Sequence, residues 1–214
     1  MKISKEIKIS INNKDINGSM EIPAAAKGIV LFAHGSGSSR FSSRNRYVAK
    51  ILNENNLGTL LFDLLTEEEE KVDIYTAEYR FNIRLLAERL ITVTDWLLKE
   101  QFINGLKVGY FGASTGAAAA LIAAAKKSDI IFAVVSRGGR PDLAMESLPE
   151  VKAPTLLIVG GEDFQVIELN KTALRMINVK KKLEIIPGAT HLFEEPGALE
   201  KVAALSAKWF IENL

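Results

Sequence analysis

Short, continuous apolar segments recur along the chain, and longer amphipathic segments separate them. The first, residues 28–33, reads G-I-V-L-F-A, which is typical of a strand covered on both faces. The further strand candidates are residues 59–62, 108–111, 130–135, 155–159 and 182–186. The helix candidates are residues 43–55, 80–100, 115–127, 166–178 and 199–213. This alternation predicts an α/β fold with a mostly parallel central sheet and helices on both faces.

The amino-terminal residues follow a different pattern, in which apolar and polar side chains alternate. Residues 7–11 and 16–22 can form two antiparallel strands, and residues 12–15 (N-N-K-D) between them favour a turn. The sequence has no internal repeat and no linker rich in proline or serine, so we expect a single domain over residues 1–214. Few residues are left over for a lid, and we therefore expect no large cap domain.

Two segments have a biased composition. Residues 67–70 are four glutamates within a long polar segment, residues 64–79, which we interpret as a solvated acidic loop. Residues 117–120 are four alanines at the start of a helix candidate. Their small side chains would let that helix approach the sheet closely.

The charge and composition argue against several classes of protein. The chain has 27 Lys and Arg against 26 Asp and Glu, and a net charge of +1 provides no basic field for nucleic acid. The absence of cysteine excludes disulfides, thiolate metal sites and a cysteine nucleophile. The two histidines are too few for a histidine-rich metal site. We therefore expect no metal and no nucleic-acid partner.

The apolar segments also bear on location. Residues 1–11 contain no apolar stretch of about 7 to 15 residues after the lysines, so they do not resemble a signal peptide. The longest apolar segment, residues 111–125, is shorter than the roughly 20 residues that a membrane-spanning helix needs. A chain without cysteine also suits a reducing compartment. We expect a cytoplasmic protein that does not bind membranes.

The strongest chemical signal is the sequence G-A-S-T-G at residues 112–116, which follows a strand candidate and opens a helix candidate. A serine at such a tight turn is held in a strained conformation that projects its hydroxyl off the sheet. The glycines on either side are needed because side chains there would clash. The positive end of the following helix points to the same place. Ser114 is therefore the candidate nucleophile.

A serine hydroxyl needs a base to take its proton and an acid to orient that base. His191 comes shortly after the strand candidate at residues 182–186, and Asp163 after the one at residues 155–159. Ligands bind at the carboxyl ends of such strands, so we expect these side chains to meet Ser114 there. Glu162 is the alternative acid; we prefer Asp163 because its side chain is shorter and stiffer. The order serine, acid, histidine is that of the α/β-hydrolase fold.

The loop after the first strand, residues 34–39 (H-G-S-G-S-S), can bring its backbone close to a ligand. In this fold, one oxyanion donor is the N–H group of the residue after the nucleophile, here Thr115. The other comes from this loop, and we place it at Ser36. Each such donor stabilises the transition state by about 3 to 4 kcal/mol. His34 is expected to hold the loop by hydrogen bonds rather than to act as a base.

Arginines are a further clue to the substrate. Arg137 and Arg140 follow the strand candidate at residues 130–135 and are therefore expected at the same edge of the sheet as the triad. Arg40, Arg44 and Arg46 flank a predicted helix start. Arg44 lies at a helix start capped by Ser42 or Ser43, where a cation opposes the helix dipole. In one interpretation Arg137, Arg140 and Arg44 bind an anionic substrate through their guanidinium groups. In the other, which is the more common arrangement, they form ion pairs. The acids for such pairs would be residues 67–70, Asp73 and Asp142.

Four segments carry a family resemblance: residues 34–40 (HGSGSSR), 112–116 (GASTG), 136–141 (SRGGRP) and 188–197 (GATHLFEEPG). Together they resemble the dienelactone hydrolase-like branch of the α/β-hydrolase superfamily, in particular small hydrolase domains that sometimes occur fused to a phosphoribosyltransferase. The resemblance covers nearly the whole chain and implies Ser114, Asp163 and His191 as the catalytic triad. Dienelactone hydrolases proper use a cysteine nucleophile, so lactone specificity is not expected. No phosphoribosyltransferase portion is present in this sequence.

These expectations combine into one function. We expect hydrolysis of an ester, thioester or related acyl bond of a small substrate through an acyl-enzyme on Ser114, without a metal or an organic cofactor. Peptide-bond cleavage would use the same groups. The alternative is a non-catalytic protein that keeps the fold for binding or as a scaffold, because a fold does not by itself imply an activity.

Overall fold

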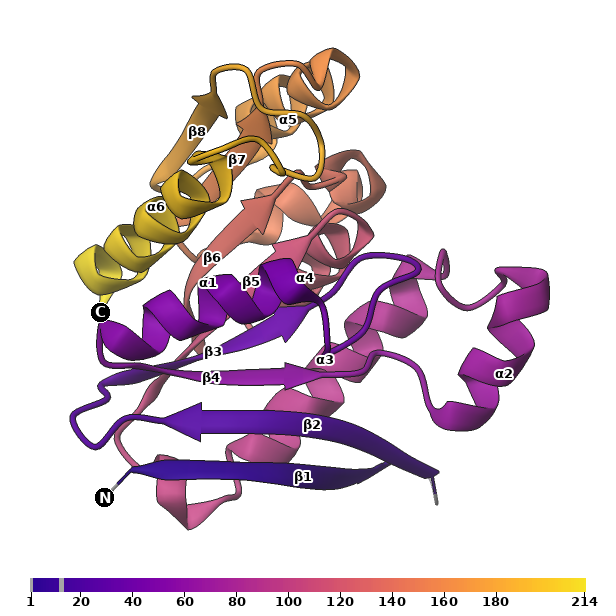
Figure 1. Cartoon of the computed structure of the whole chain (residues 1–214), viewed down its shortest axis with the longest axis vertical. Helices are drawn as coiled ribbons and strands as arrows, with labels where there is room; N and C mark the ends of the chain where they lie inside the picture. Colours follow the sequence, from indigo (N-terminus) through magenta and orange to yellow (C-terminus); the bar gives the residue numbers. More distant parts are fainter. Residues whose placement is uncertain (1, 12–13) are drawn as a thin grey trace.

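The computed structural model describes residues 2–11 and 14–214. Its eight strands form one open sheet with the order β1-β2-β4-β3-β5-β6-β7-β8 (Figure 1). The strands are β1 (Ile3–Ile11), β2 (Lys14–Ile22), β3 (Gly28–Ala33), β4 (Leu57–Phe62), β5 (Lys107–Ala113), β6 (Ile131–Arg137), β7 (Thr155–Gly160) and β8 (Lys181–Ile186). The helices are α1 (Ser43–Glu54), α2 (Glu67–Thr76), α3 (Ile83–Leu97), α4 (Thr115–Lys126), α5 (Phe164–Met176) and α6 (Ala198–Asn213), with 3-10 segments η1 (Gln101–Ile103) and η2 (Pro141–Glu150).

The sheet has the expected mixed character. Strands β3 to β8 run parallel to one another, whereas β2 runs antiparallel to β4 and pairs with β1 as a hairpin. In the hairpin Ile11 pairs with Lys14, so Lys14 and Asp15 belong to β2 and not to the expected turn. The rest of that turn, residues 12–13, lies outside the described residues. The prediction of a mostly parallel sheet with an antiparallel amino-terminal hairpin is confirmed.

Helices cover both faces of the sheet (Figure 1). Helices α1 and α6 pack on one face, where the core includes Phe32, Phe111 and Phe210. Helices α3, α4 and α5 pack on the other face. Strands β3, β4 and β7 are buried along their whole length, which explains their continuous apolar sequences. None of the helices in the described part of the chain combines the length and apolar character that a bilayer crossing requires.

Helix α4 lies against the sheet directly behind the candidate nucleophile. Its alanines at residues 117–120 are fully buried. The helix contacts β5, β6 and β3 on its sheet side and α3 and η2 on its other sides. Small side chains allow this close packing, as the sequence predicted, and the packing fixes the amino-terminal end of α4.

The acidic segment was predicted wrongly as a loop. It contains α2, which begins after Thr66 with a capping box: the Thr66 N–H group donates to Glu69 at 2.9 Å and the Glu69 N–H group donates to Thr66 Oγ1 at 3.3 Å. The glutamates of the first turn also face the positive end of the helix dipole. A buried ion pair between Glu69 and Arg89 ties α2 to α3.

The bounds of other helices and strands differ by a few residues from those predicted from the sequence. Helix α3 begins at Ile83 and not at residue 80, because Asn82 caps it by accepting a hydrogen bond from the Leu85 N–H group at 3.1 Å. Arg80 is held outside the helix by Asp73, at 2.5 Å between Nε and Oδ2. The 3-10 segment η2, which follows β6 and begins with Pro141, was not predicted from the sequence.

Candidate active site

Ser114 lies at the sharp turn between β5 and α4. Its backbone has φ 51° and ψ −121°, and residues with a side chain rarely adopt such a positive φ. Such strain persists only where the surrounding structure enforces it. Here β5 fixes one side of the turn and the buried helix α4 fixes the other.

The two glycines of the motif are required by close packing. A Cβ atom on Gly112 would lie 2.4 Å from the Ala117 Cα atom. On Gly116 it would lie 2.2 Å from the carbonyl oxygen of Ala33 in β3. Both contacts are with backbone, which cannot move aside, so the expected clash is confirmed at both positions.

The turn after β6 lies between Ser114 and the loop that carries His191, residues 187–197, which we call the histidine loop. The Ser114 N–H group donates to the carbonyl oxygen of Arg137 at 3.1 Å, and the Arg140 N–H group donates to the carbonyl oxygen of Ser114 at 3.1 Å. Between them, Gly138 has φ 52°, and a Cβ atom on it would lie 3.5 Å from His191 Cε1. One short turn therefore contacts both Ser114 and the imidazole ring.

Asp163 and His191 form a hydrogen-bonded pair. The distance between Asp163 Oδ2 and His191 Nδ1 is 2.6 Å, and the two side chains are 15% and 38% exposed. Asp163 follows β7 and precedes α5, whereas His191 lies in the loop between β8 and α6. Glu162 is exposed, and its N–H group donates to the carbonyl oxygen of Ala189. The carboxylate next to the imidazole is thus that of Asp163.

The second ring nitrogen of His191, Nε2, forms no hydrogen bond with the described residues, Ser114 Oγ included. The structure therefore brings Ser114 and His191 to the same turn without joining them directly. In substrate-free enzymes, catalytic hydrogen bonds are often long and tighten only when substrate binds.

The loop after β3 reaches the nucleophile. A Cβ atom on Gly35 would lie 3.1 Å from the Ser114 Cβ atom. The Ser36 N–H group donates to Thr115 Oγ1 at 2.9 Å. The two predicted oxyanion donors thus belong to residues that contact each other, although the Ser36 N–H group is engaged by the Thr115 hydroxyl. That hydroxyl contact was not anticipated, because nothing in the sequence pairs residues 79 positions apart.

His34 fixes this loop through hydrogen bonds, as predicted from the sequence. Its Nδ1 atom lies 2.9 Å from the Gly35 carbonyl oxygen, and its Nε2 atom accepts the Leu64 N–H group at 3.1 Å. This arrangement requires a neutral ring with the proton on Nδ1. Burial lowers the pKa of His34 below its ordinary value, although the hydrogen bond to Gly35 and the charge of Asp63 oppose this effect.

This depressed pKa predicts a pH-dependent stability. The unfolded chain binds a proton at His34 below about pH 6.5, whereas the folded protein does so only at lower pH. The free energy of unfolding should therefore fall as the pH drops below about 6.5, by up to about 1.4 kcal/mol per pH unit from this group. Urea unfolding between pH 7 and pH 5 should show this slope in the wild type and in His191→Ala. His34→Gln should lack it; an unchanged slope in that variant would contradict the assignment.

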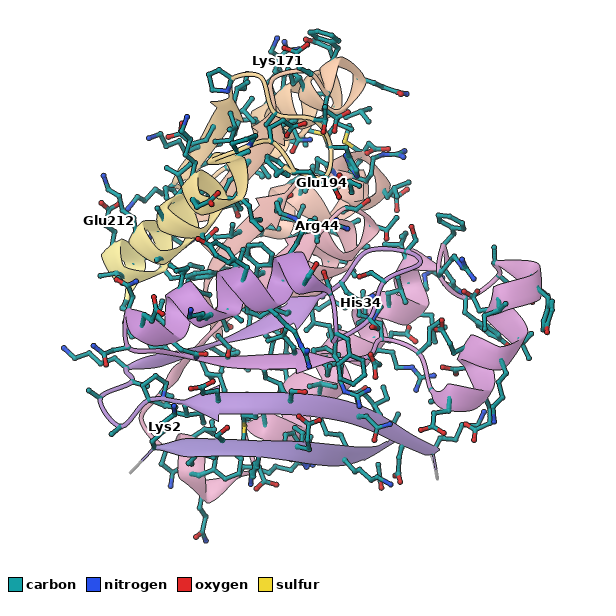
Figure 2. All side chains as sticks on the ribbon, viewed as in Figure 1. Lys2, His34, Arg44, Lys171, Glu194 and Glu212 are labelled. Atoms are coloured by element: carbon teal, nitrogen blue, oxygen red, sulfur yellow. The ribbon has the colours of Figure 1, made fainter. Side chains whose placement is uncertain are left out.

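Two of the three candidate substrate-binding arginines have acidic partners. Arg140 binds Asp142 through two hydrogen bonds of 2.9 Å and 2.8 Å, and this contact raises the pKa of Arg140. Arg44 Nη1 lies 3.0 Å from Glu194 Oε1, and Figure 2 shows the two residues next to each other. Ion pairing, the second interpretation of these arginines, thus describes Arg140 with its predicted partner. Glu194 was not predicted, since 150 residues separate it from Arg44.

Arg137 differs from the other two. It is the last residue of β6, is 7% exposed, and forms no ion pair with the described residues. Its Nη1 atom is buried without a hydrogen-bond partner among them. Burial, together with the nearby charge of Arg44, lowers the pKa of Arg137 to about 10. The guanidinium therefore still carries its charge at neutral pH.

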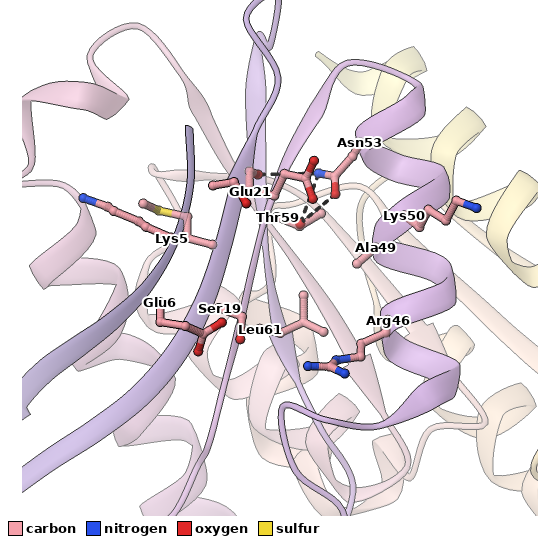
Figure 3. A pocket seen from close by; sticks show the side chains of 12 residues that line it. Lys5, Glu6, Ser19, Glu21, Arg46, Ala49, Lys50, Asn53, Thr59 and Leu61 are labelled. Atoms are coloured by element: carbon pink, nitrogen blue, oxygen red, sulfur yellow. Dashed lines mark hydrogen bonds between the residues drawn. The ribbon is translucent and has the colours of Figure 1, made fainter. Parts of the chain in front are cut away.

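Exposed apolar side chains directly follow both Asp163 and His191 in the sequence. Phe164, next to Asp163, is 68% exposed, and Leu192, next to His191, is 40% exposed. A cavity of about 350 Å³ lies between the loop after β3 and helix α2, and His34, Ser38 and Phe41 are among the residues that line it. A cavity of about 430 Å³ lies between the β1–β2 hairpin and α1 (Figure 3). Arg46 is among its lining residues, but none of the candidate triad, oxyanion or substrate-binding residues is.

The model of the dienelactone hydrolase family matches residues 24–210. The chain belongs to the dienelactone hydrolase family. This confirms the resemblance inferred from the four motifs. Membership of this family supports a hydrolase.

Several proteins of known sequence or structure are similar to this chain along most of its length. The dienelactone hydrolase from Anabaena variabilis is 56% identical, with a TM-score of 0.97 over 100% of this chain and 99% of that one. Est1E from Butyrivibrio proteoclasticus is 17% identical, with a TM-score of 0.82 over 97% of this chain and 98% of that one, and shares the fold. Proteins of two Mycobacterium tuberculosis strains, each named "putative phosphoribosyl transferase", are 55% identical over 210 residues. The match covers 98% of this chain and 46% of theirs.

Proposed function

We propose that the protein is a serine hydrolase that cleaves an ester, thioester or related acyl bond of a small substrate. The observation that carries this proposal is the hydrogen-bonded pair of Asp163 and His191, with its ring against the turn that also binds the backbone of Ser114. A strained serine at a strand-to-helix turn and an acid–histidine pair at the neighbouring strand ends are the parts that this chemistry needs.

In the acylation step, His191 Nε2 takes the proton of Ser114 Oγ as the oxygen attacks the acyl carbon. The Asp163 carboxylate accepts a hydrogen bond from His191 Nδ1–H, which keeps the proton on Nδ1 and leaves Nε2 free to act as the base. It also stabilises the imidazolium that forms. The tetrahedral intermediate then collapses, and His191 returns the proton to the leaving alcohol, thiol or amine.

The negative charge on the acyl oxygen requires hydrogen-bond donors. The N–H group of Thr115 lies at the amino terminus of α4, and that of Ser36 lies across the turn. In this proposal the Ser36 N–H group breaks its hydrogen bond to the Thr115 hydroxyl and donates to the oxyanion instead. The charged acceptor is the stronger partner, so the exchange favours the transition state over the ground state.

Deacylation repeats the same steps with water. His191 takes a proton from water, the hydroxide attacks the acyl carbon, and Ser114 Oγ leaves with the proton from His191. The chemistry requires no metal and no organic cofactor. The exposure of His191, Phe164 and Leu192 favours a small substrate, or a group that protrudes from a larger one.

A fluorophosphonate probe tests this proposal directly, because it reacts covalently with activated serines. We expect stoichiometric labelling of the folded protein and, after digestion, a modified peptide that carries the probe on Ser114. The denatured protein is the control and should not react. A folded protein that resists the probe would instead favour the non-catalytic scaffold.

A further inference from the structure

The charge of Arg137 is not balanced within the described residues. The protein contains a second arginine that is equally buried, Arg89 at 9% exposed, and that one binds the carboxylate of Glu69. Arg137 is 7% exposed and has neither an acidic partner nor a hydrogen bond at Nη1 in the same residues. A buried charge is unfavourable unless it is paired, so a partner from outside the chain would complete this site.

The neighbourhood of Arg137 adds positive charge instead of neutralising it. Arg44 is close enough to disfavour the charged form of Arg137, and its own Nε atom is buried without a partner. Arg44 also lies in the first turn of α1, which has no acidic residue to offset the positive end of the helix. The carboxylate that binds Arg44, that of Glu194, is 65% exposed and therefore partly hydrated.

The position of Arg137 connects this charge to the reacting serine. Its carbonyl oxygen accepts the Ser114 N–H group, and the next residue, Gly138, lies against the His191 ring. Arg137 is the last residue of β6, so its side chain starts from the same edge of the sheet as Ser114, and the charge of Arg44, which binds Glu194 in the loop after His191, lies near its guanidinium. Guanidinium groups bind carboxylates and phosphates through two parallel hydrogen bonds.

We propose that Arg137, assisted by Arg44, binds an anionic group of the substrate, a carboxylate or a phosphate, next to Ser114. This inference rests on the hydrolase function proposed above and names its substrate class. It also explains why one arginine of this edge is unpaired while Arg140 is neutralised by Asp142.

The first experiment measures anion binding without catalysis. The thermal unfolding of the wild type is followed with increasing inorganic phosphate and, separately, succinate, at constant ionic strength. We expect one of them to raise the Tm, and the effective one identifies the phosphate or the carboxylate. The shift should persist in Arg84→Gln, an exposed arginine on α3, and disappear in Arg137→Gln. No shift with either anion, or an equal shift in Arg137→Gln, would overturn the proposal.

The second experiment places the anion in the reaction site. The same anion should inhibit hydrolysis of 4-nitrophenyl butyrate competitively, and its inhibition constant should weaken by about 10- to 100-fold in Arg137→Gln. Non-competitive inhibition would refute a subsite beside Ser114. If Arg137→Gln does not fold, Arg137→Lys keeps the charge without the planar fork and should still weaken binding. If the protein hydrolyses no ester, the hydrolase proposal fails, whereas the Tm experiment still decides whether Arg137 binds anions.

Discussion

Replacement of Ser114 by alanine is expected to lower kcat for a 4-nitrophenyl ester by about 10⁶-fold, because the acyl-enzyme can no longer form. Alanine keeps the Cβ atom and can keep the same backbone conformation of the turn, so the free energy of unfolding should change little. Steady-state kinetics and urea unfolding of the same preparation measure the two effects.

The matched control for this variant is Ser128→Ala, which removes a serine hydroxyl just beyond the other end of α4. It should retain the wild-type rate. If Ser114→Ala kept more than about one thousandth of the wild-type kcat, the nucleophile would have to be sought elsewhere, since removal of a triad member has a much larger effect in serine hydrolases.

Asparagine at position 163 is expected to reduce kcat by about 10⁴-fold with little loss of stability. The amide fills the same space as the carboxylate, but it can donate a proton to His191 Nδ1 and so favour the tautomer whose Nε2 is already protonated. Such a ring cannot take the proton of Ser114. The rate can be measured with the same ester, and the free energy of unfolding with urea.

Glu162→Gln provides the control, because it makes the same chemical change one residue earlier on an exposed side chain. It should leave kcat close to that of the wild type. The opposite result, with the loss in Glu162→Gln and near-normal turnover in Asp163→Asn, would assign the orienting acid to Glu162.

The central strands β3, β4 and β7 were predictable because burial on both faces requires a continuous apolar sequence. Runs such as G-I-V-L-F-A at Gly28–Ala33 have no polar interruption, and the structure buries that strand completely. Helix α2 was missed because its apolar residues do not form a buried face: of its side chains only Asp73 is buried. Its capping box, Thr66 with Glu69, is a local signal that could have revealed it.

The position of the candidate site was predictable for a topological reason. Ser114, Asp163 and His191 each follow a strand of a parallel sheet, so they share one edge whatever the details of the loops. Contacts between distant loops could not be predicted in the same way. The pairing of Arg44 with Glu194 and the burial of Arg137 depend on how α1 and the histidine loop pack, which no local pattern records.

The two outer strands of the sheet expose their backbone along one side, and each carries charged side chains there. Strand β1 exposes Lys5, Glu6 and Lys8, and β8 exposes Lys181 and Lys182. A second sheet that paired with either strand would have to bury these charges or bring like charges together. The charges on the edge strands thus oppose self-association of the protein through its sheet edges. An open eight-stranded sheet can therefore end in two unpaired strands.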